Sequence, residues 1–325
     1  MEQKRKKIAC IVGPTATGKT ALSILVAKGM DAEIVSADSV QVYRGLDIGS
    51  AKPTKEERQG IPHHMIDCVA VDQPGFSVSQ YKEMAGEAIH DIYSRGKMPL
   101  VVGGSGLYVH ALTYPLNFAI PSDPTVREKL EAAYTPQNQM QAWEKLHEVD
   151  PTTADRLHPN DRKRIIRALE VYACSGKPLS AFGNDFVNAE GREAPYEPIL
   201  FGLEMERAVL YERIDRRVDK MLEQGLLNEV RQLASLGLSR RLPALQSIGY
   251  RQLLDYLDGQ ITYEEAVARI KQETRRFAKR QISWFKRDTR IIWYNALDKP
   301  LEWIAEQVAD QIRCWIDGES YNEDQ

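Results

Sequence analysis

The segment GPTATGKT, Gly13–Thr20, is the strongest indication in the sequence of how this chain folds. It matches the phosphate-binding pattern G-x-x-x-x-G-K-[ST] at every fixed position. An apolar run, Lys6–Val12, precedes it, and a helical pattern from Lys19 to Lys28 follows. A strand, a glycine-rich turn and a helix in this order predict a parallel sheet covered by helices, with a phosphate-binding loop at its edge.

The chemistry of the loop explains each fixed position. Glycines let backbone N–H groups point at phosphate oxygens, and the start of the helix adds positive potential. Lys19 supplies a point charge, and the hydroxyl of Thr20 is a ligand for Mg²⁺. We therefore expect phosphate or pyrophosphate on the loop and a metal on Thr20, with the anion held by Gly13, Pro14, Thr15, Ala16, Thr17, Gly18, Lys19 and Thr20.

Further apolar runs predict the rest of an α/β fold, a P-loop NTPase-like parallel sheet flanked by helices. Between residues 118 and 198 the sequence becomes a series of helical patterns broken by prolines. We expect a core of residues 1–117 and 199–325 and a mostly helical insertion domain of residues 118–198. The predicted strands after the first are Glu33–Ser36, Pro99–Val102, Ile199–Leu203 and Arg290–Tyr294.

The loop alone does not name the reaction. The strand PLVVGGSG ends in Gly103, Gly104 and Ser105, where motor proteins and GTPases carry a strand that ends in aspartate. This absence leaves small kinases and other users of pyrophosphate. A non-catalytic, nucleotide-gated RNA-binding protein is the alternative from a different class.

Asp38 follows the second predicted strand, at the sheet edge that should also carry the phosphate loop. A carboxylate there can accept a proton from an attacking nucleophile. An aspartate followed by serine is also a common turn or helix cap. The spacing leaves both interpretations open.

Charge is unevenly distributed, although the net charge is only -3. Residues 271–290 contain eight basic and two acidic side chains, and a second basic cluster comprises Arg162, Lys163, Arg164 and Arg167. On a helix, Arg276, Lys279 and Arg280 share a face, which favours a surface that follows an RNA backbone.

Several other features favour ordinary structural roles. His63 and His64 are adjacent and have no third ligand at a familiar spacing, so we expect no metal there. The four cysteines form no CxxC pair, and no apolar run approaches the roughly 20 residues that span a membrane. We expect a cytoplasmic protein without a membrane partner. Core packing is the expectation for Trp284, Trp293, Trp303 and Trp315.

The motifs together resemble the bacterial tRNA dimethylallyltransferase (tRNA isopentenyltransferase) family. The resemblance rests on GPTATGKT and on stretches that follow it in the family's order: residues 36–54, 60–67, 103–108, 160–172, 217–230, 247–252 and 274–285. It implies transfer of a dimethylallyl group from dimethylallyl diphosphate to N6 of the adenosine on the 3′ side of the anticodon. The implied partners are dimethylallyl diphosphate and the anticodon stem-loop of tRNA. We also expect Mg²⁺ as cofactor, from the hydroxyl of Thr20, and a monomer, because a monomer suits a surface that must wrap a tRNA arm.

The resemblance also implies roles for individual residues. The phosphate loop would hold the diphosphate, Asp38 would be the general base, Ser105 would orient it, and Arg217 would join Lys19 as catalytic residues on the diphosphate. Together with the basic helix, it gives an expected tRNA-binding set of Asp38, Ser39, Val40, Gln41, Ser105, Arg127, Arg162, Lys163, Arg164, Ile165, Ile166, Arg276, Lys279, Arg280 and Gln281.

Overall fold

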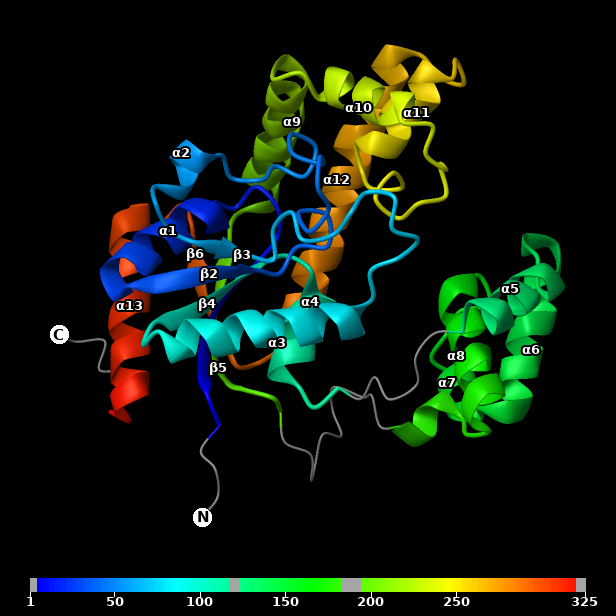
Figure 1. The fold of residues 1–325 in the computed structure, drawn as a ribbon, viewed down its shortest axis with the longest axis horizontal. Helices are drawn as coiled ribbons and strands as arrows, with labels where there is room; N and C mark the ends of the chain where they lie inside the picture. Colours follow the sequence, from blue (N-terminus) through cyan, green and yellow to red (C-terminus); the bar gives the residue numbers. More distant parts are fainter. Residues whose placement is uncertain (1–4, 117–122, 183–193, 320–325) are drawn as a thin grey trace. The chain divides into compact units, whose positions relative to one another are not determined.

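The structure, a computed structural model, describes residues 5–116, 123–182 and 194–319 (Figure 1). Compact packing divides the chain into two units: Met1–Thr113 with Tyr196–Gln325, and Tyr114–Pro195. The second unit, Tyr114–Pro195, occupies nearly the same residues as the predicted insertion of residues 118–198. The predicted first residue of the insertion, Phe118, lies outside the described residues. No helix in the described ranges has the length and apolar character needed to cross a membrane.

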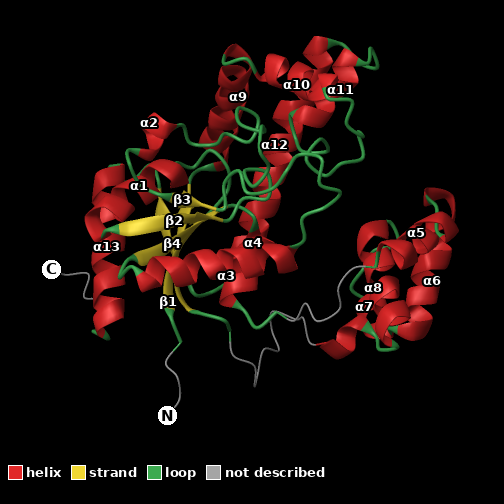
Figure 2. Cartoon of the chain, viewed as in Figure 1, coloured by secondary structure: helices red, strands yellow, loops and turns green. Residues whose placement is uncertain are grey.

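The first unit is built on a parallel sheet with the strand order β3-β2-β4-β1-β5-β6. Figure 2 shows the strands gathered together with helices around them. Strand β1 has neighbours on both sides and reads as a continuous apolar run, as expected for a parallel strand buried on both faces. The strands are β1 (Lys7–Val12), β2 (Ala32–Ser36), β3 (His63–His64), β4 (Met98–Gly103), β5 (Glu197–Glu204) and β6 (Ile291–Asn295).

Alternate residues of β1 serve the two faces of the sheet. Ala9 and Ile11 pack with α1 (Lys19–Met30) and α13 (Leu301–Asp317), which lie together on one side in Figure 1. Ile8 and Cys10 pack on the opposite face with the remaining helices. Those helices are α3 (Val78–Ser94), α4 (Gly106–Thr113), α9 (Arg207–Glu223), α10 (Leu226–Ser235), α11 (Tyr250–Leu257) and α12 (Tyr263–Phe285), and the short α2 (Lys55–Arg58) completes the first unit.

The second unit consists of helices in its described part. It has its own apolar core, in which Leu146, Ile165 and Ala168 are buried. Prolines in this segment mark helix starts, since α5 begins at Pro124 and α7 begins at Pro151. The elements are α5 (Pro124–Ala133), α6 (Gln139–Val149), α7 (Pro151–Ala154) and α8 (Arg162–Ser175), with 3-10 turns at Pro136–Asn138 and Leu179–Phe182.

The parallel α/β fold predicted from the sequence is confirmed. Two details differ. Strand β3 was not predicted because it is only two residues long. His64 in this strand donates from Nε2 to Oε2 of the buried Glu33 carboxylate at 2.8 Å, which is a structural role. The prediction of core packing was wrong for Trp303, which remains 40% exposed with Lys299 over its ring.

Candidate active site

The candidate site lies where neighbouring parallel strands end. Strand β1 ends at Val12 before the phosphate loop, β2 ends at Ser36 just before Asp38, and β4 ends at Gly103 just before Ser105. Ala37 N donates to Val102 O at 2.8 Å, and Ser105 N donates to Ala37 O at 3.1 Å, so the two chain segments stay paired beyond their strands. The sheet therefore brings Asp38 and Ser105 together beside the loop.

The phosphate loop is shaped by its backbone and by its own side chains. Gly13 has φ 141°, and a Cβ there would lie 2.5 Å from Leu203 O, so only glycine fits. Thr17 Oγ1 donates to Pro14 O at 2.9 Å, and Lys19 Nζ donates to the same oxygen at 2.6 Å. Helix α1 begins at Lys19, which leaves its first N–H groups at the loop for an anion.

Gln281 closes the loop from a distant part of the chain. Its side chain is 6% exposed; Oε1 accepts from Thr15 N at 2.9 Å and Nε2 donates to Gly104 O at 2.9 Å. Gln281 was expected among the tRNA contacts, but both ends of its amide are used inside the protein. We correct that assignment: the Gln281 side chain joins the phosphate loop to the segment after β4.

Two cations and one carboxylate dominate the electrostatics of the site. Burial, reinforced by the neighbouring Arg217 guanidinium, lowers the pKa of Lys19 to about 7, while Asp38 opposes the shift. Burial also lowers the pKa of Arg217, again against the attraction of Asp38. Arg217 of α9 thus lies within electrostatic reach of both Lys19 and Asp38. Such a pair of cations is suited to a ligand with more than one negative charge.

Asp38 combines the two roles that the sequence left open. Its Oδ1 accepts from Val40 N at 2.8 Å and from Gln41 N at 3.2 Å, which is the geometry of an Asx turn. Within the described residues Oδ2 takes part in no hydrogen bond, so one carboxylate oxygen shapes the turn while the other is available. The side chain is partly exposed, as a residue that meets a substrate must be.

Ser105 lies beside Asp38, but its hydroxyl forms hydrogen bonds with the next residue, Ser39. Ser105 Oγ accepts from Ser39 N at 3.0 Å and approaches Ser39 Oγ at 3.2 Å. The hydroxyl thus fixes the backbone directly after Asp38. Val40 and Gln41 are partly buried in this turn, and the Gln41 side chain accepts from Ser36 Oγ at 3.1 Å.

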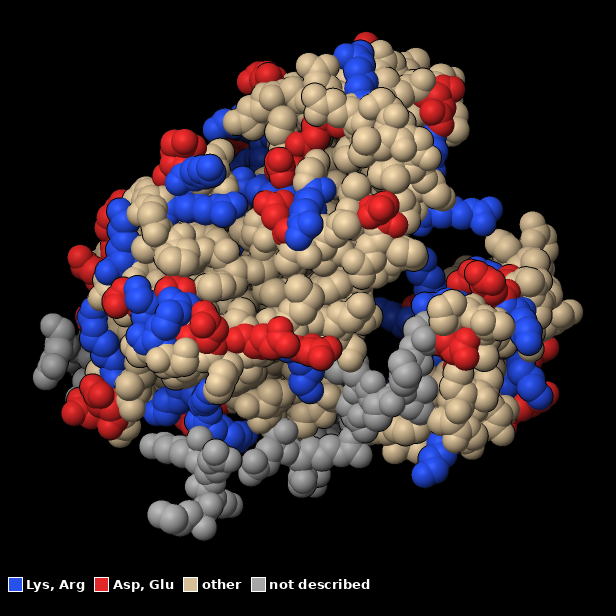
Figure 3. Space-filling model, in the orientation of Figure 1, with Lys and Arg blue, Asp and Glu red and all other residues tan. Residues whose placement is uncertain are grey.

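The basic face of α12 is present. Arg276, Lys279 and Arg280 are exposed, and no ion pair involves them within the described part of the chain. By contrast, Arg275 is paired with Asp215 of α9 at 2.5 Å, which ties the two helices together. Acidic side chains gather elsewhere, in a row along α3 (Figure 3), where Glu83, Glu87 and Asp91 recur every fourth residue.

The expected tRNA-binding residues of the second unit divide into exposed and buried groups. Lys163 and Arg164 are exposed, whereas the side chains of Ile165 and Ile166 are buried in the core of that unit. The expectation that the side chains of Ile165 and Ile166 contact tRNA is therefore wrong, because both side chains pack in the core.

The two flanking arginines of that unit are held by neighbours. Arg162 Nε donates to Tyr134 O at 2.6 Å, at the end of α5. Arg127 lies 3.7 Å from Glu131 and 4.0 Å from the buried Glu170.

The residues near the loop suit a metal that arrives with its ligand. Thr20 is exposed at the start of α1 and offers one hydroxyl oxygen. Among the described residues, no group of three His, Cys, Asp or Glu side chains is placed to hold a metal ion. Mg²⁺ commonly keeps waters and substrate phosphate oxygens as ligands, so Thr20 with a diphosphate is a chemically adequate set.

Sequence reasoning placed Asp38, Ser105, Lys19 and Arg217 in one region, and the structure brings them together. It did not find the structural role of Gln281, because a glutamine on a basic helix carries no signal of an inward-facing amide. The available hint was its position on the apolar side of the helical pattern, in line with Ala278 and Phe285 and opposite Lys279.

Comparison with known proteins agrees with this geometry. The family model "IPP transferase" matches residues 41–288. A tRNA dimethylallyltransferase of Carboxydothermus hydrogenoformans is 45% identical over 304 residues, which cover 93% of this chain and 96% of the relative.

Solved structures that resemble this chain come from the same class of enzyme. The tRNA isopentenylpyrophosphate transferase of Bacillus halodurans has a TM-score of 0.72 and 40% identity, with 97% of this chain and 98% of that chain covered. A eukaryotic dimethylallyltransferase solved while acting on tRNA has a TM-score of 0.77 and 29% identity, with 98% of this chain and 81% of that chain covered. The chain therefore belongs to the IPP transferase family, whose curated relatives are tRNA dimethylallyltransferases.

Proposed function

We propose that this enzyme transfers the dimethylallyl group of dimethylallyl diphosphate to N6 of the adenosine on the 3′ side of the anticodon in tRNA. The observation that carries the proposal is the position of Asp38, at the edge of the phosphate loop and within electrostatic reach of Lys19 and Arg217. A proton acceptor and an anion site side by side are what an alkyl transfer to an amine requires.

The anion site would hold the leaving group. The loop N–H groups, Lys19 and Arg217 would bind the diphosphate and take up the negative charge that grows as the C–O bond breaks. In the free protein Lys19 Nζ donates to Pro14 O, a contact that diphosphate oxygens would replace. Mg²⁺, if held by Thr20 and the diphosphate, would add charge neutralisation.

Asp38 would act on the nucleophile. As N6 attacks the allylic carbon, the new N–C bond forms, the C–O bond electrons leave with the diphosphate, and the N6 proton passes to the Asp38 carboxylate. Oδ2 suits this step because Oδ1 already holds the turn. The exocyclic amine is a weak nucleophile, so removal of its proton during attack contributes to the rate.

The tRNA would be bound mainly through its phosphates. Arg276, Lys279 and Arg280 form an exposed basic face on α12, and Lys163 and Arg164 are exposed in the second unit. Ser39, Val40 and Gln41 adjoin Asp38 and so would meet the target nucleoside itself. The monomeric state of the enzyme stays a prediction.

The alternative kinase activity is tested by the choice of ligand. We expect dimethylallyl diphosphate to bind with micromolar affinity and ATP to compete weakly, because the cations of the site match a diphosphate and no aspartate ends β4. Tight binding of ATP with hydrolysis or phosphoryl transfer, and no binding of dimethylallyl diphosphate, would overturn the proposal.

A further inference from the structure

A single carboxylate joins residues from three of the motif stretches, at positions that have no role of their own in the proposed reaction. It belongs to Glu229 of α10, in residues 217–230, and it contacts residues 47–49 and Tyr250. All of these residues belong to the first unit of the structure.

Glu229 accepts hydrogen bonds from successive backbone N–H groups. Its Oε2 accepts from Asp47 N at 3.1 Å and from Ile48 N at 2.8 Å, and its Oε1 accepts from Gly49 N at 3.2 Å. Successive N–H groups that converge in this way form an anion-binding concavity, which here is filled by the protein's own carboxylate. Hydrogen bonds to a charged acceptor are among the stronger ones in proteins.

Tyr250 completes the contact. Its hydroxyl donates to Glu229 Oε1 at 2.7 Å, and its ring is fully buried. Burial and the adjacent Glu229 carboxylate raise the pKa of Tyr250, so the hydroxyl stays a donor. A Cβ at Gly49 would lie 2.6 Å from this ring, so glycine is required for the segment to reach the carboxylate.

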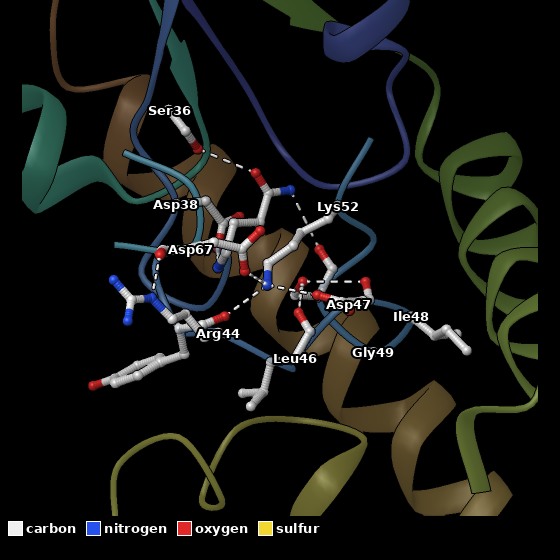
Figure 4. Close-up of polar contacts among 12 residues, drawn as sticks. Ser36, Asp38, Arg44, Leu46, Asp47, Ile48, Gly49, Lys52 and Asp67 are labelled. Atoms are coloured by element: carbon white, nitrogen blue, oxygen red, sulfur yellow. Dashed lines mark hydrogen bonds and ion pairs between the residues drawn. The ribbon is translucent and has the colours of Figure 1, made fainter. Parts of the chain in front are cut away.

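Lys52 holds the same segment from another direction, as Figure 4 shows. Its Nζ donates to Tyr43 O at 2.6 Å, to Asp47 Oδ1 at 2.7 Å and to Asp67 Oδ1 at 2.5 Å. The Lys52 side chain is only 5% exposed. Asp47 is therefore fixed through its backbone by Glu229 and through its side chain by Lys52.

Gln41 connects this segment to Asp38. Its Nε2 donates to Ser50 O and to Ala51 O, each at 3.3 Å, directly after the residues that Glu229 holds. Its backbone N donates to Asp38 Oδ1 at 3.2 Å. A continuous series of contacts thus runs from Glu229 through residues 47–51 and Gln41 to the carboxylate of Asp38.

We propose that Glu229 is a positioning residue for catalysis: by ordering residues 47–51 it holds, through Gln41, the Asp38 carboxylate in the geometry of a general base. The inference rests on the proposed function, in which Asp38 accepts the N6 proton. Glu229 itself touches neither substrate nor reacting atom. Its role is to keep one oxygen of Asp38 committed to the turn and the other directed at the nucleophile.

The test replaces Glu229 with a neutral isostere. Glu229→Gln keeps the volume but turns an NH₂ group against backbone N–H donors. Tyr250→Phe removes one of the four hydrogen bonds and keeps the buried ring, so it is a milder second variant if the first folds poorly. Glu223→Gln is the matched control, because Glu223 is an exposed glutamate at the end of α9.

The first measurement is hydrogen exchange of a peptide that covers residues 44–52, in the complete protein without substrates. We expect exchange at residues 47–49 to accelerate about tenfold or more in Glu229→Gln, less in Tyr250→Phe, and not in the control. Unchanged exchange in both variants overturns the ordering role. This measurement does not depend on any activity.

The second measurement separates turnover from binding. We expect Glu229→Gln to lower kcat about 10- to 100-fold with the KM for dimethylallyl diphosphate within about twofold, because the phosphate loop keeps its contacts. Added to Asp38→Asn, it should lower kcat little further, because both changes affect the same group. Faster exchange with normal kcat, or fully multiplicative effects in the double variant, overturns the positioning role. If the unaltered enzyme transfers no dimethylallyl group, the proposed function fails, and exchange still decides whether Glu229 orders the segment.

Discussion

Replacement of Gln281 is the perturbation for which the structure gives the clearest consequences. Gln281→Leu removes both the acceptor for Thr15 N and the donor to Gly104 O. A buried backbone group left without a partner costs about 1–3 kcal/mol, and less where water can reach it. The contact with Gly104 O is buried, whereas the contact with Thr15 N is only partly buried. We expect a total loss of about 2–4 kcal/mol in the free energy of unfolding.

The same change should loosen the phosphate loop. Thr15 N loses its fixed partner, so the affinity for dimethylallyl diphosphate should fall along with stability. Gln281→Glu is the sharper comparison: it keeps an acceptor for Thr15 N but places a negative charge beside the bound diphosphate. We expect it to weaken diphosphate binding about tenfold or more relative to wild type.

Urea unfolding and calorimetric titration of dimethylallyl diphosphate measure these two effects. Gln272→Leu is the control, since Gln272 is exposed on the same helix. A Gln281→Leu variant that unfolds like wild type and binds the diphosphate normally would contradict this structural role of Gln281. If it loses only tRNA affinity, Gln281 is an RNA contact after all.

The remaining predictions concern the site and its RNA surface. The pKa of Lys19 near 7 means that the lysine loses its charge as the pH rises above 7; bound diphosphate favours the charged form, so affinity should fall by up to tenfold per pH unit from about pH 7 upward. Titration calorimetry at several pH values checks this. The Lys19→Ala variant should bind dimethylallyl diphosphate weakly, and its affinity should not show this fall above pH 7. Asp38→Asn keeps Oδ1 as acceptor for Val40 N and removes the base, so kcat should fall about 10²- to 10⁴-fold while tRNA affinity is retained and diphosphate binding tightens; equal losses of kcat and tRNA affinity would argue against the base. Arg276→Ala with Arg280→Ala should weaken tRNA binding and reduce the salt slope by up to about two, whereas Arg269→Ala, which breaks only the exposed pair with Glu265, should not; an unchanged slope would place the RNA surface elsewhere.

Much of the fold could be predicted because its signals are local. The apolar run of β1, the glycines of the loop and the helical pattern after Lys19 each read directly from the sequence, and the strands after it were predicted to within a few residues. Asp38 and Ser105 could be placed together because parallel strands end at the same edge. Among the strands of the described residues, β3 alone was not predicted, since two residues carry no periodicity.

The rest of the site depends on contacts between distant residues. Gln281 reaches Thr15 across 266 positions, and Glu229 reaches Gly49 across 180. Neither contact is encoded in the spacing of nearby residues, so a buried glutamine reads as part of a basic helix and a structural glutamate as a surface charge. Ile165 and Ile166 illustrate the converse, because a family motif includes residues that serve only the core.

Analysis of the reaction products is the decisive test of dimethylallyl transfer by this enzyme. The complete enzyme is incubated with labelled dimethylallyl diphosphate and unmodified tRNA, and the nucleosides of the anticodon loop are then separated and weighed by mass spectrometry. We expect free diphosphate and one added dimethylallyl group on N6 of the adenosine next to the anticodon. Label retained in the donor, or a phosphate in place of the hydrocarbon on the acceptor, would contradict dimethylallyl transfer.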